Sequence, residues 1–450
     1  MEFRNLTPFE ALCFQAQDLD GEEHPVVAMK VGYRLHPVAG QPGQCVAQVL
    51  DDAPLPLCLA DVYEEEPGIS SVREESDLAP FKPRCDVIVV GHAHAPGGRP
   101  TTTWLAGLRI TAAHPPHDIP DPPPPTPAAG QRLTYDELQA YQAQRQEAER
   151  QRAAQRTPQV LLDKHLRVSG PRQFEHGLLT WRAGEIAPAA AVVLRWEHAF
   201  GGTSRIDNPA YAHDPAAPPT LLNEVCYSNP LGGGWLDHRF EKLYYQQHGE
   251  LLTRLYAPQI TYPDDIIERP YLAHPPAGEL DADGMAEQAA SYAHAPAGFG
   301  VVGRAWAPRL ALAGSYDNDW LAQRWPGLPE DFDFGYWNGA PEDQQIAYLP
   351  TDARIELHHL VDPRLSDANG TLSVTLPGHR PFVLMRLTNG VMLPLPLLTD
   401  TVRIDTDAMT LSLTHRLSLP NHLDIRVLEA RFEVDPAAPI LRRAPRKEAA

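Results

Sequence analysis

Asp86-Val87-Ile88-Val89-Val90-Gly91 is a short run of β-branched, apolar residues that ends in a glycine. An apolar run of this length predicts a strand buried on both faces. Residues 26–35 have the same character. Further strands are predicted at 104–112, 159–168, 178–182, 191–197, 354–360, 371–376, 381–388, 401–405, 409–415 and 424–433. These short runs, with Gly and Pro between them, favour a mainly β fold of antiparallel, β-sandwich-like sheets with long loops.

One segment has helical character instead. Residues 135–156 are rich in Gln, Arg, Glu and Ala, and Thr134 followed by Glu137 forms a capping-box pattern. A proline-rich stretch at 115–130, expected to be extended and exposed, precedes this helix. Because the helix has few large apolar side chains, we expect an exposed insertion of one polar helix. It is either a tolerated loop insertion or an arm that docks a partner.

The chain divides into five predicted regions. They are an N-terminal β region (1–114), the spacer and helix (115–157), a β region with long loops (158–350), a C-terminal β region (351–435) and a basic tail (436–450). Residues 205–300 are rich in loop signals. The aromatic residues at 320–338, which stand among prolines, predict a long loop pinned by aromatic side chains rather than regular structure.

Composition excludes some classes of function. The formal net charge of -20 argues against binding nucleic acid, which needs a basic face. The 47 prolines require a chain rich in turns and short strands. The odd number of cysteines, 5, with no CxxC pair, favours free thiols in a reducing compartment. There is no signal-peptide pattern and no apolar stretch long enough to span a membrane, so we expect a cytoplasmic protein that does not associate with membranes.

Catalytic signatures are scarce. The sequence contains no phosphate-binding loop, zinc-protease helix or nucleophile elbow. Residues 298–303 match GxGxxG, but Pro308 would stop the helix that a dinucleotide site needs. His92 and His94 stand on one face of a strand end and could share a metal ion; a structural turn is the alternative. The carboxylates of 330–334 could act as an acid/base pair, although loop carboxylates are usually solvated.

Cys85 precedes the β run and is expected to be a small core residue rather than a nucleophile. We therefore predict no catalytic residue, no cofactor and no bound metal. A β-rich chain with long loops is also compatible with a recognition protein, because loops on a rigid sheet frame usually carry binding residues.

Segments along the whole chain resemble a known bacterial family. The first is Phe81-Lys82-Pro83-Arg84-Cys85-Asp86-Val87-Ile88-Val89-Val90-Gly91-His92-Ala93-His94-Ala95-Pro96-Gly97-Gly98. In order follow Leu194–Gly202, Ser228–Gly232, Pro296–Gly300, Trp306–Arg309, Ala313–Asp317, Trp320, Leu328–Asp333 and Asn338–Gln345. The chain is similar, over about residues 3 to 430, to a family catalogued as a domain of unknown function, whose genes accompany VgrG, PAAR and toxin genes of type VI secretion. The insertion at 115–156 and Cys85, where the family usually has a hydroxyl residue, depart from the pattern.

The resemblance implies a non-enzymatic adaptor, or chaperone, of the type VI secretion system. Such a protein binds a cognate effector protein, often linked to a PAAR-repeat protein, and loads it onto the VgrG spike. Two alternatives stay open: a metal-dependent hydrolase using His92 and His94, and a carbohydrate-binding or structural spike component. The resemblance carries no catalytic residues. The motif residues that are either structural or partner-binding are Asp86, Gly91, His92, His94, Pro96, Gly97, Gly98, Trp196, Gly201, Gly202, Asn229, Pro230, Gly298, Phe299, Gly300, Trp306, Trp320, Asp331, Phe332 and Gln344.

Overall fold

The computed structural model describes residues 1–113, 122, 135–154, 158–177, 180–274, 276 and 278–440. Most of the predicted spacer at 115–130, the capping residue Thr134 and the tail from 441 onward lie outside the described residues. Within them no helix is both long and apolar enough to cross a membrane.

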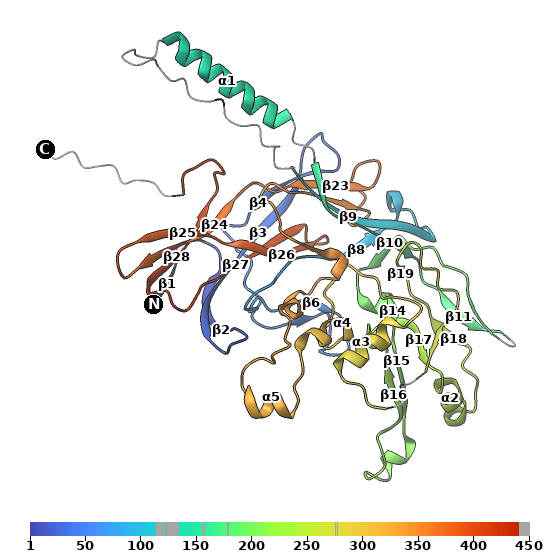
Figure 1. Ribbon diagram of the computed structural model, residues 1–450. Helices are drawn as coiled ribbons and strands as arrows, with labels where there is room; N and C mark the ends of the chain where they lie inside the picture. Colours follow the sequence, from blue (N-terminus) through green and yellow to red (C-terminus); the bar gives the residue numbers. More distant parts are fainter. Residues whose placement is uncertain are drawn as a thin grey trace.

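A twelve-stranded sheet forms the frame of the molecule (Figure 1). Its order is β19 (Ile260–Thr261), β10 (Pro158–Ser169), β9 (Thr103–Ala113), β22 (Arg354–His358), β23 (Thr371–Thr375), β4 (Gln44–Val49), β3 (Glu23–Pro37), β27 (Thr410–Ser418), β26 (Leu398–Asp405), β7 (Cys85–Val90) and β21 (Gln345–Ile346), while β2 (Ala11–Gln17) pairs with β3. Strand β7 contains the apolar run that begins at Asp86, and all six of its residues are buried. The prediction of a buried strand there is confirmed.

A four-stranded sheet packs against this frame. Its order is β1 (Glu2–Asn5), β28 (Ile425–Glu433), β24 (Arg380–Leu387) and β25 (Met392–Pro396). Val383 and Leu428 from this sheet belong to the same buried cluster as Val27 and Leu411 from the large sheet. Burying two inner sheet faces against each other removes much apolar area from water, which is the main force that holds such layers together.

The expected mainly β fold is confirmed, and its pairing is mixed. Strands β7 and β26 are parallel, as are β4 and β23, and β1 and β28. Parallel neighbours need a long connection between them, and these pairs join parts of the chain that are far apart in sequence. The large sheet takes strands from the 1–114, 158–350 and 351–435 regions, so these regions share one frame. The division into regions stays a prediction.

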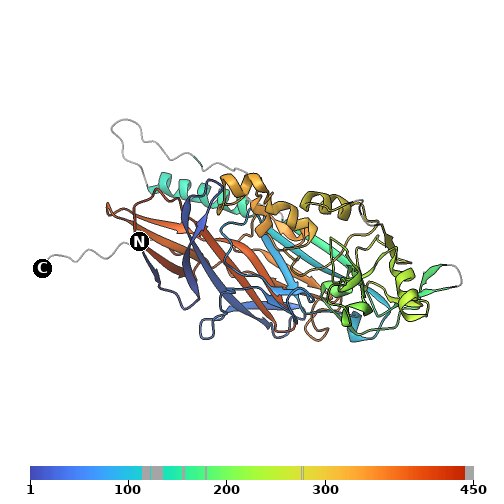
Figure 2. The same ribbon diagram turned by 90° about the horizontal axis from the view of Figure 1, so that it is seen from below.

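Most of the smaller sheets lie toward the end of the molecule away from the N-terminus (Figure 2). A second buried cluster, which includes Phe174, Phe200 and Trp235, joins several of these sheets. The sheets are β8 (His92–His94) with β13 (Ala191–Val193), β12 (Trp181–Ala183) with β11 (Gln173–His176) and β18 (Arg254–Tyr256), β14 (Phe200–Gly201) with β17 (Gly233–Asp237) and β20 (Tyr271–Ala273), β15 (Thr203–Asp207) with β16 (Thr220–Val225), and β5 (Val62–Tyr63) with β6 (Val72–Glu74).

The described helices are short apart from one. They are α1 (Tyr135–Ala154), α2 (Phe240–His248), α3 (Ala282–Ala290), α4 (Ala307–Leu310) and α5 (Asn318–Gln323), with the 3-10 turns η1 (Pro96–Gly98), η2 (Trp196–His198), η3 (Pro209–Ala212), η4 (Ala311–Ala313), η5 (Phe334–Trp337) and η6 (Glu342–Gln344). The predicted polar helix is confirmed as α1, which projects from the sheets at the upper left of Figure 1.

Two local predictions differ from the structure. The strand predicted at 191–197 ends at Val193, because the chain turns there into η2. The aromatic segment at 320–338, predicted to lack regular structure, contains the end of α5 and the turn η5. Asp317 starts α5 by accepting a hydrogen bond from the Trp320 N–H at 2.8 Å. An N-cap residue of this kind can start a short helix. The aromatic residues of the segment gave no indication of this helix.

Deletion of residues 118–156 is expected to leave the fold intact. Ala113 at the end of β9 pairs directly with Pro158 at the start of β10. The deletion leaves residues 114–117 and 157 to join them, a length within the usual range for hairpin loops. The soluble yield and the midpoint of urea unfolding should match those of the full chain within error. Aggregation of the shortened protein would show that the helix belongs to the core.

Acidification is expected to destabilise the protein through His415 on β27. The side chain is 3% exposed, and burial lowers its pKa to about 3. In the unfolded chain the pKa of a histidine is ~6.5. As the pH falls below this value, the unfolded chain binds a proton at His415 and the folded protein does not, so unfolding is favoured. Lowering the pH from 7 to 5 should cost about 2 kcal/mol of unfolding free energy from this group alone. Urea unfolding of wild type and His415→Gln at both pH values measures this loss of unfolding free energy. If both proteins lose the same amount, His415 is not the group responsible.

Candidate functional site

An open cleft of about 710 Å³ lies between helix α3 and the start of α4. Its size is in the range of protein sites that bind ligands or partner side chains. Alanine, proline and aromatic side chains make up most of its surface. The lining residues are Arg84, Trp196, Ser228, Tyr262, Ala286, Ala289, Ala290, Ala295, Pro296, Val302, Trp306, Pro308, Pro341, Glu342 and Asp343.

Most of these residues belong to the motif segments that the sequence singled out. Arg84, Trp196, Ser228, Pro296, Trp306, Pro308, Pro341, Glu342 and Asp343 come from six such segments, which are scattered between residues 81 and 345. The fold therefore brings the scattered motifs to one place. Sequence order alone gave no reason to expect this, because it does not report which loops meet in space.

Two tryptophans form the floor of the cleft. Trp196 and Trp306 lie edge to face, with ring centroids 5.5 Å apart and planes at 85°. The Trp196 indole Nε1 donates to the Val301 carbonyl at 2.6 Å, which fixes the ring. A Cβ at Gly298 would lie 3.0 Å from the Trp196 ring, so the glycine allows this close packing. The tryptophans are 4% and 8% exposed and provide a rigid surface rather than projecting anchors.

Asn229 shapes the turn beside Trp196. Its side chain is fully buried, and its Nδ2 donates to the carbonyls of Trp196 and Phe200, both at 2.9 Å. Gly201 has a φ of 147°, and a Cβ there would lie 2.1 Å from the Asn229 carbonyl oxygen. The interpretation of this motif as a turn former is therefore supported. The predicted residues Gly202 and Pro230 lie on the two adjacent segments that meet here; Gly202 donates its N–H to Asn229 O at 2.9 Å and Pro230 O accepts from Thr203.

Asp86, the first residue of the apolar run, is buried beneath the cleft. It is 0% exposed, and Lys82 Nζ donates to its Oδ2 at 2.8 Å. The Asn338 amide at 3.0 Å and the N–H groups of Gly339 at 2.9 Å and Ala340 at 3.2 Å also donate to this carboxylate. Burial opposes the charge on Lys82, but nearby carboxylates, Asp86 foremost, hold its pKa above the usual value. Asp86 thus ties the strand to the motif loop at 338–345.

Lys164 on β10 joins the motif segment 296–300 to the segment 338–345. Its Nζ donates to the Gly298 carbonyl at 2.8 Å, to Asp343 Oδ1 at 2.7 Å and to Gln344 Oε1 at 2.6 Å. Gln344 is buried, and its Nε2 donates to the Phe299 carbonyl at 3.0 Å. Burial lowers the pKa of Lys164 to about 8, although Asp343 opposes this. An ammonium group has three N–H donors, and three acceptors bind them here. Lys164 therefore holds these segments together and does not present a free amine that could act as a nucleophile.

Phe299 and Gly300 complete the segment that matches GxGxxG. Phe299 is 1% exposed, and its carbonyl also accepts from the Val89 N–H at 3.0 Å. No helix begins within 298–303, since α4 starts only at Ala307. The segment therefore lacks the helix N-terminus that a pyrophosphate needs. The expectation that Pro308 stops a helix is wrong, because Pro308 lies in the first turn of α4, where its missing N–H needs no partner.

The histidine motif lies outside the cleft. His92 Nδ1 is 2.8 Å from Asp407 Oδ2, and the rings of His92 and His94 are 6.2 Å apart. Burial, with His92 nearby, lowers the pKa of His94. Among the described residues no group of three or more His, Cys, Asp or Glu side chains is arranged to hold a metal ion. Gly91, with a φ of 122°, lies against Thr406, and Pro96, Gly97 and Gly98 form the exposed turn η1.

Trp320, Asp331 and Phe332 also lie apart from the cleft. Trp320 and Asp331 line a separate hollow of about 380 Å³ near α5. The Ser315 N–H and hydroxyl donate to Asp331 at 2.9 and 2.8 Å and lower its pKa. Phe332 is buried and packs edge to face on Phe334. The carboxylate is thus used to hold a loop, and the aromatic residues pin the segment as predicted.

Helix α3 supplies the wall that sequence reasoning missed. Ala286, Ala289 and Ala290 line the cleft, and Asp281 caps the helix by accepting from the Gly284 N–H at 2.8 Å. The pattern Asp281 to Ala290 contains a cap and good helix formers, so the helix itself was detectable. Nothing in the sequence marks its alanines as functional, because they contribute only by being small and so leaving the cleft open.

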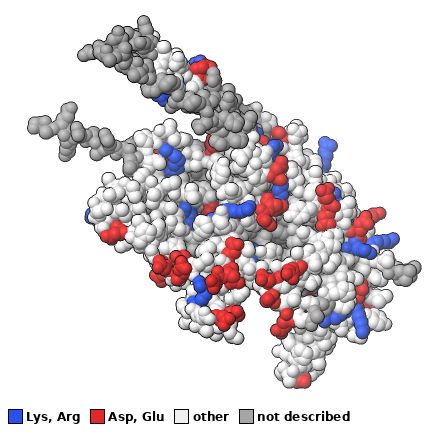
Figure 3. Space-filling model, in the orientation of Figure 1, with Lys and Arg blue, Asp and Glu red and all other residues white. Residues whose placement is uncertain are grey.

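The arrangement suits recognition. The polar motif residues are engaged in internal hydrogen bonds, while the cleft presents apolar surface with charges at its rim, where Arg84, Glu342 and Asp343 are exposed. Acidic side chains are also numerous over the visible face of the molecule (Figure 3). Apolar surface bordered by charge is typical of a surface that binds another protein.

The fold is mainly β, and the cleft described above is lined largely by the motif segments. The chain belongs to the family described as "Uncharacterized protein conserved in bacteria (DUF2169)", whose model matches residues 20–115 and 139–416. The unmatched interval contains the proline-rich stretch and the start of α1, whereas the rest of the helix falls inside the match. No curated protein matches the chain, and no solved structure does.

Proposed function

We propose that this protein is an adaptor, or chaperone, of the type VI secretion system. It binds a cognate effector in the cytoplasm and loads it onto the VgrG/PAAR spike without catalysing a reaction. The observation that carries the proposal is the convergence of the motif segments, through which the chain resembles such adaptors, on one open apolar cleft.

The contacts of the buried motif residues support a binding function rather than a catalytic one. Asp86, Asn229 and Gln344 are buried and hold loops in place through internal hydrogen bonds. Their role in binding is to keep the cleft preformed, which lowers the entropic cost of association.

The cleft suits an apolar segment of a partner protein. Its floor of Trp196 and Trp306 and its alanine wall can receive a few large apolar side chains, in the manner of a helix bound in a groove. Exposed Arg84 and Glu342 at the rim can pair with charges that flank such a segment. The effector therefore needs an apolar, helix-forming stretch that is exposed before it is loaded.

Co-expression with the products of the neighbouring genes tests the proposal. The tagged protein should retain the effector or the PAAR-repeat protein encoded beside it, and a non-cognate effector should not be retained. Recovery of the tagged protein in folded form, with neither partner nor VgrG bound, would contradict the proposed function.

A further inference from the structure

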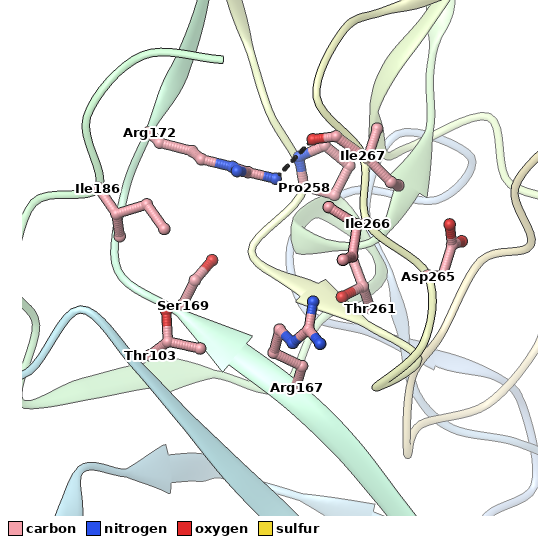
Figure 4. A pocket seen from close by; sticks show the side chains of 10 residues that line it. All are labelled: Thr103, Arg167, Ser169, Arg172, Ile186, Pro258, Thr261, Asp265, Ile266 and Ile267. Atoms are coloured by element: carbon pink, nitrogen blue, oxygen red, sulfur yellow. Dashed lines mark hydrogen bonds between the residues drawn. The ribbon is translucent and has the colours of Figure 1, made fainter.

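A second cavity contains two arginine side chains. It has a volume of about 340 Å³ and lies where β10 and β19 meet the segment 263–267 (Figure 4). Arg167 lies on β10, and Arg172 follows three residues after its end. Figure 4 shows both guanidinium groups directed into the same space.

Backbone carbonyls hold the two arginines in position. Arg172 Nη2 donates to the Ile267 carbonyl at 2.8 Å, and Arg167 Nη2 donates to the Pro263 carbonyl. Both acceptors belong to the loop that closes the cavity, so the loop and the arginines fix each other. The guanidinium groups are therefore preorganised and need no large rearrangement to receive a ligand.

No carboxylate contacts either guanidinium group directly in the part of the chain that the structure describes. The buried Nε of Arg172 has no hydrogen-bond partner there. Burial lowers the pKa of Arg172, and the neighbouring charge of Arg167 adds to this effect, while the charge of Glu268 opposes it. Two like charges held close together, with no carboxylate in direct contact with either, are unfavourable, and a bound anion would relieve the cost.

The lining selects the kind of anion. Asp265 contributes one negative charge, and its Oδ1 is held by His294 Nδ1 at 2.6 Å. The lining itself, with two arginines and one aspartate, has a formal charge of +1, and the exposed Glu268 nearby adds negative charge outside it. This balance matches a monoanion better than a doubly charged phosphate. Ile186, Ile266 and Ile267 form the apolar side of the cavity. A guanidinium group pairs with a carboxylate through two parallel hydrogen bonds.

We propose that this cavity binds one carboxylate group carried on a short apolar body. Arg167 and Arg172 receive the carboxylate, and the isoleucines cover the apolar part. A free branched-chain carboxylic acid and the C-terminus of a polypeptide that ends in an aliphatic residue share this chemistry. The inference is independent of the adaptor proposal, since it concerns a different cavity and needs no partner protein.

Saturation-transfer NMR with the full chain tests the proposal. The probes are 4-methylpentanoate, its uncharged amide, and the peptide acetyl-Ala-Ala-Leu with a free carboxylate. Saturable binding of the acid or of the peptide, with the amide at least tenfold weaker, is expected. Tighter binding of the acid would indicate a small-molecule ligand, and tighter binding of the peptide would indicate a polypeptide end. Equal binding of acid and amide, or binding of neither charged probe, would overturn the proposal.

Variants locate the bound probe. Arg172→Gln should weaken binding of the charged probe at least tenfold. Ile186→Trp should block the cavity without changing its charge, which guards against a folding defect in the arginine variant. Arg182→Gln is the matched control, because that side chain is 75% exposed on β12 and outside the cavity. Melting curves establish that each variant is folded. Unchanged binding in folded Arg172→Gln and Ile186→Trp would place the ligand elsewhere and refute the assignment.

Discussion

Replacement of Asp86 by alanine is expected to lower the free energy of unfolding by about 3–5 kcal/mol. The carboxylate accepts four hydrogen bonds, and one of them comes from the ammonium group of Lys82, whose side chain is 6% exposed. Without Asp86, the buried Lys82 ammonium group loses its paired carboxylate and keeps the Thr401 hydroxyl as an acceptor, while two backbone N–H groups lose their acceptor. Leaving a buried charge unpaired costs far more than removing the matched pair together.

Urea unfolding measures this loss, and Asp407→Ala is its control. Asp407 also pairs with a basic side chain, His92 at 2.8 Å, but it is 49% exposed. Surface pairs of this kind contribute less than about 1 kcal/mol. We therefore expect a large effect at Asp86 and a small one at Asp407. Similar effects at both positions would show that the motif aspartate is not the structural tie described above.

Ala290→Arg is expected to weaken binding of the cognate partner at least a hundredfold. Ala290 is the last residue of α3, is exposed, and lines the cleft. A long charged side chain there would occupy the space that the partner's apolar residues need, and burying it without a partner charge would be costly. The fold should tolerate it, because basic residues are favourable at helix C-termini.

Glu287→Arg provides the matched control on the same helix. Glu287 is exposed but does not line the cleft, so the variant adds the same side chain outside the site. Titration calorimetry with the purified partner should give near wild-type affinity for Glu287→Arg and a loss only for Ala290→Arg. Equal losses in both would point to an effect of charge on association rather than to occupation of the cleft.

The frame of the molecule could be predicted from the sequence because its signals are local. The run at 86–91 and the strand at 26–35 are read directly from apolar, β-branched residues, and both lie in the large sheet. The polar helix at 135–154 was equally clear from its composition. Parallel pairing of β7 with β26 was not foreseeable, since the two strands are separated by about 300 residues of intervening chain.

The cleft could be predicted only in part. The sequence singled out Trp196 and Trp306, but the packing of one ring on the other depends on loops that lie about a hundred residues apart. Ala290 and Tyr262 have no motif around them, and their place in the lining follows from tertiary structure alone. For Asp86 and Gln344 the sequence left structural and binding roles open, and burial favours the structural one.

Hydrogen–deuterium exchange of the protein with and without its cognate effector tests the docking surface most directly. If the cleft receives the partner, the peptides covering α3 and residues 296–308 should exchange more slowly in the complex, while β25 at the far sheet edge should be unaffected. A complex in which these peptides exchange as in the free protein, with protection appearing only elsewhere, would contradict the account.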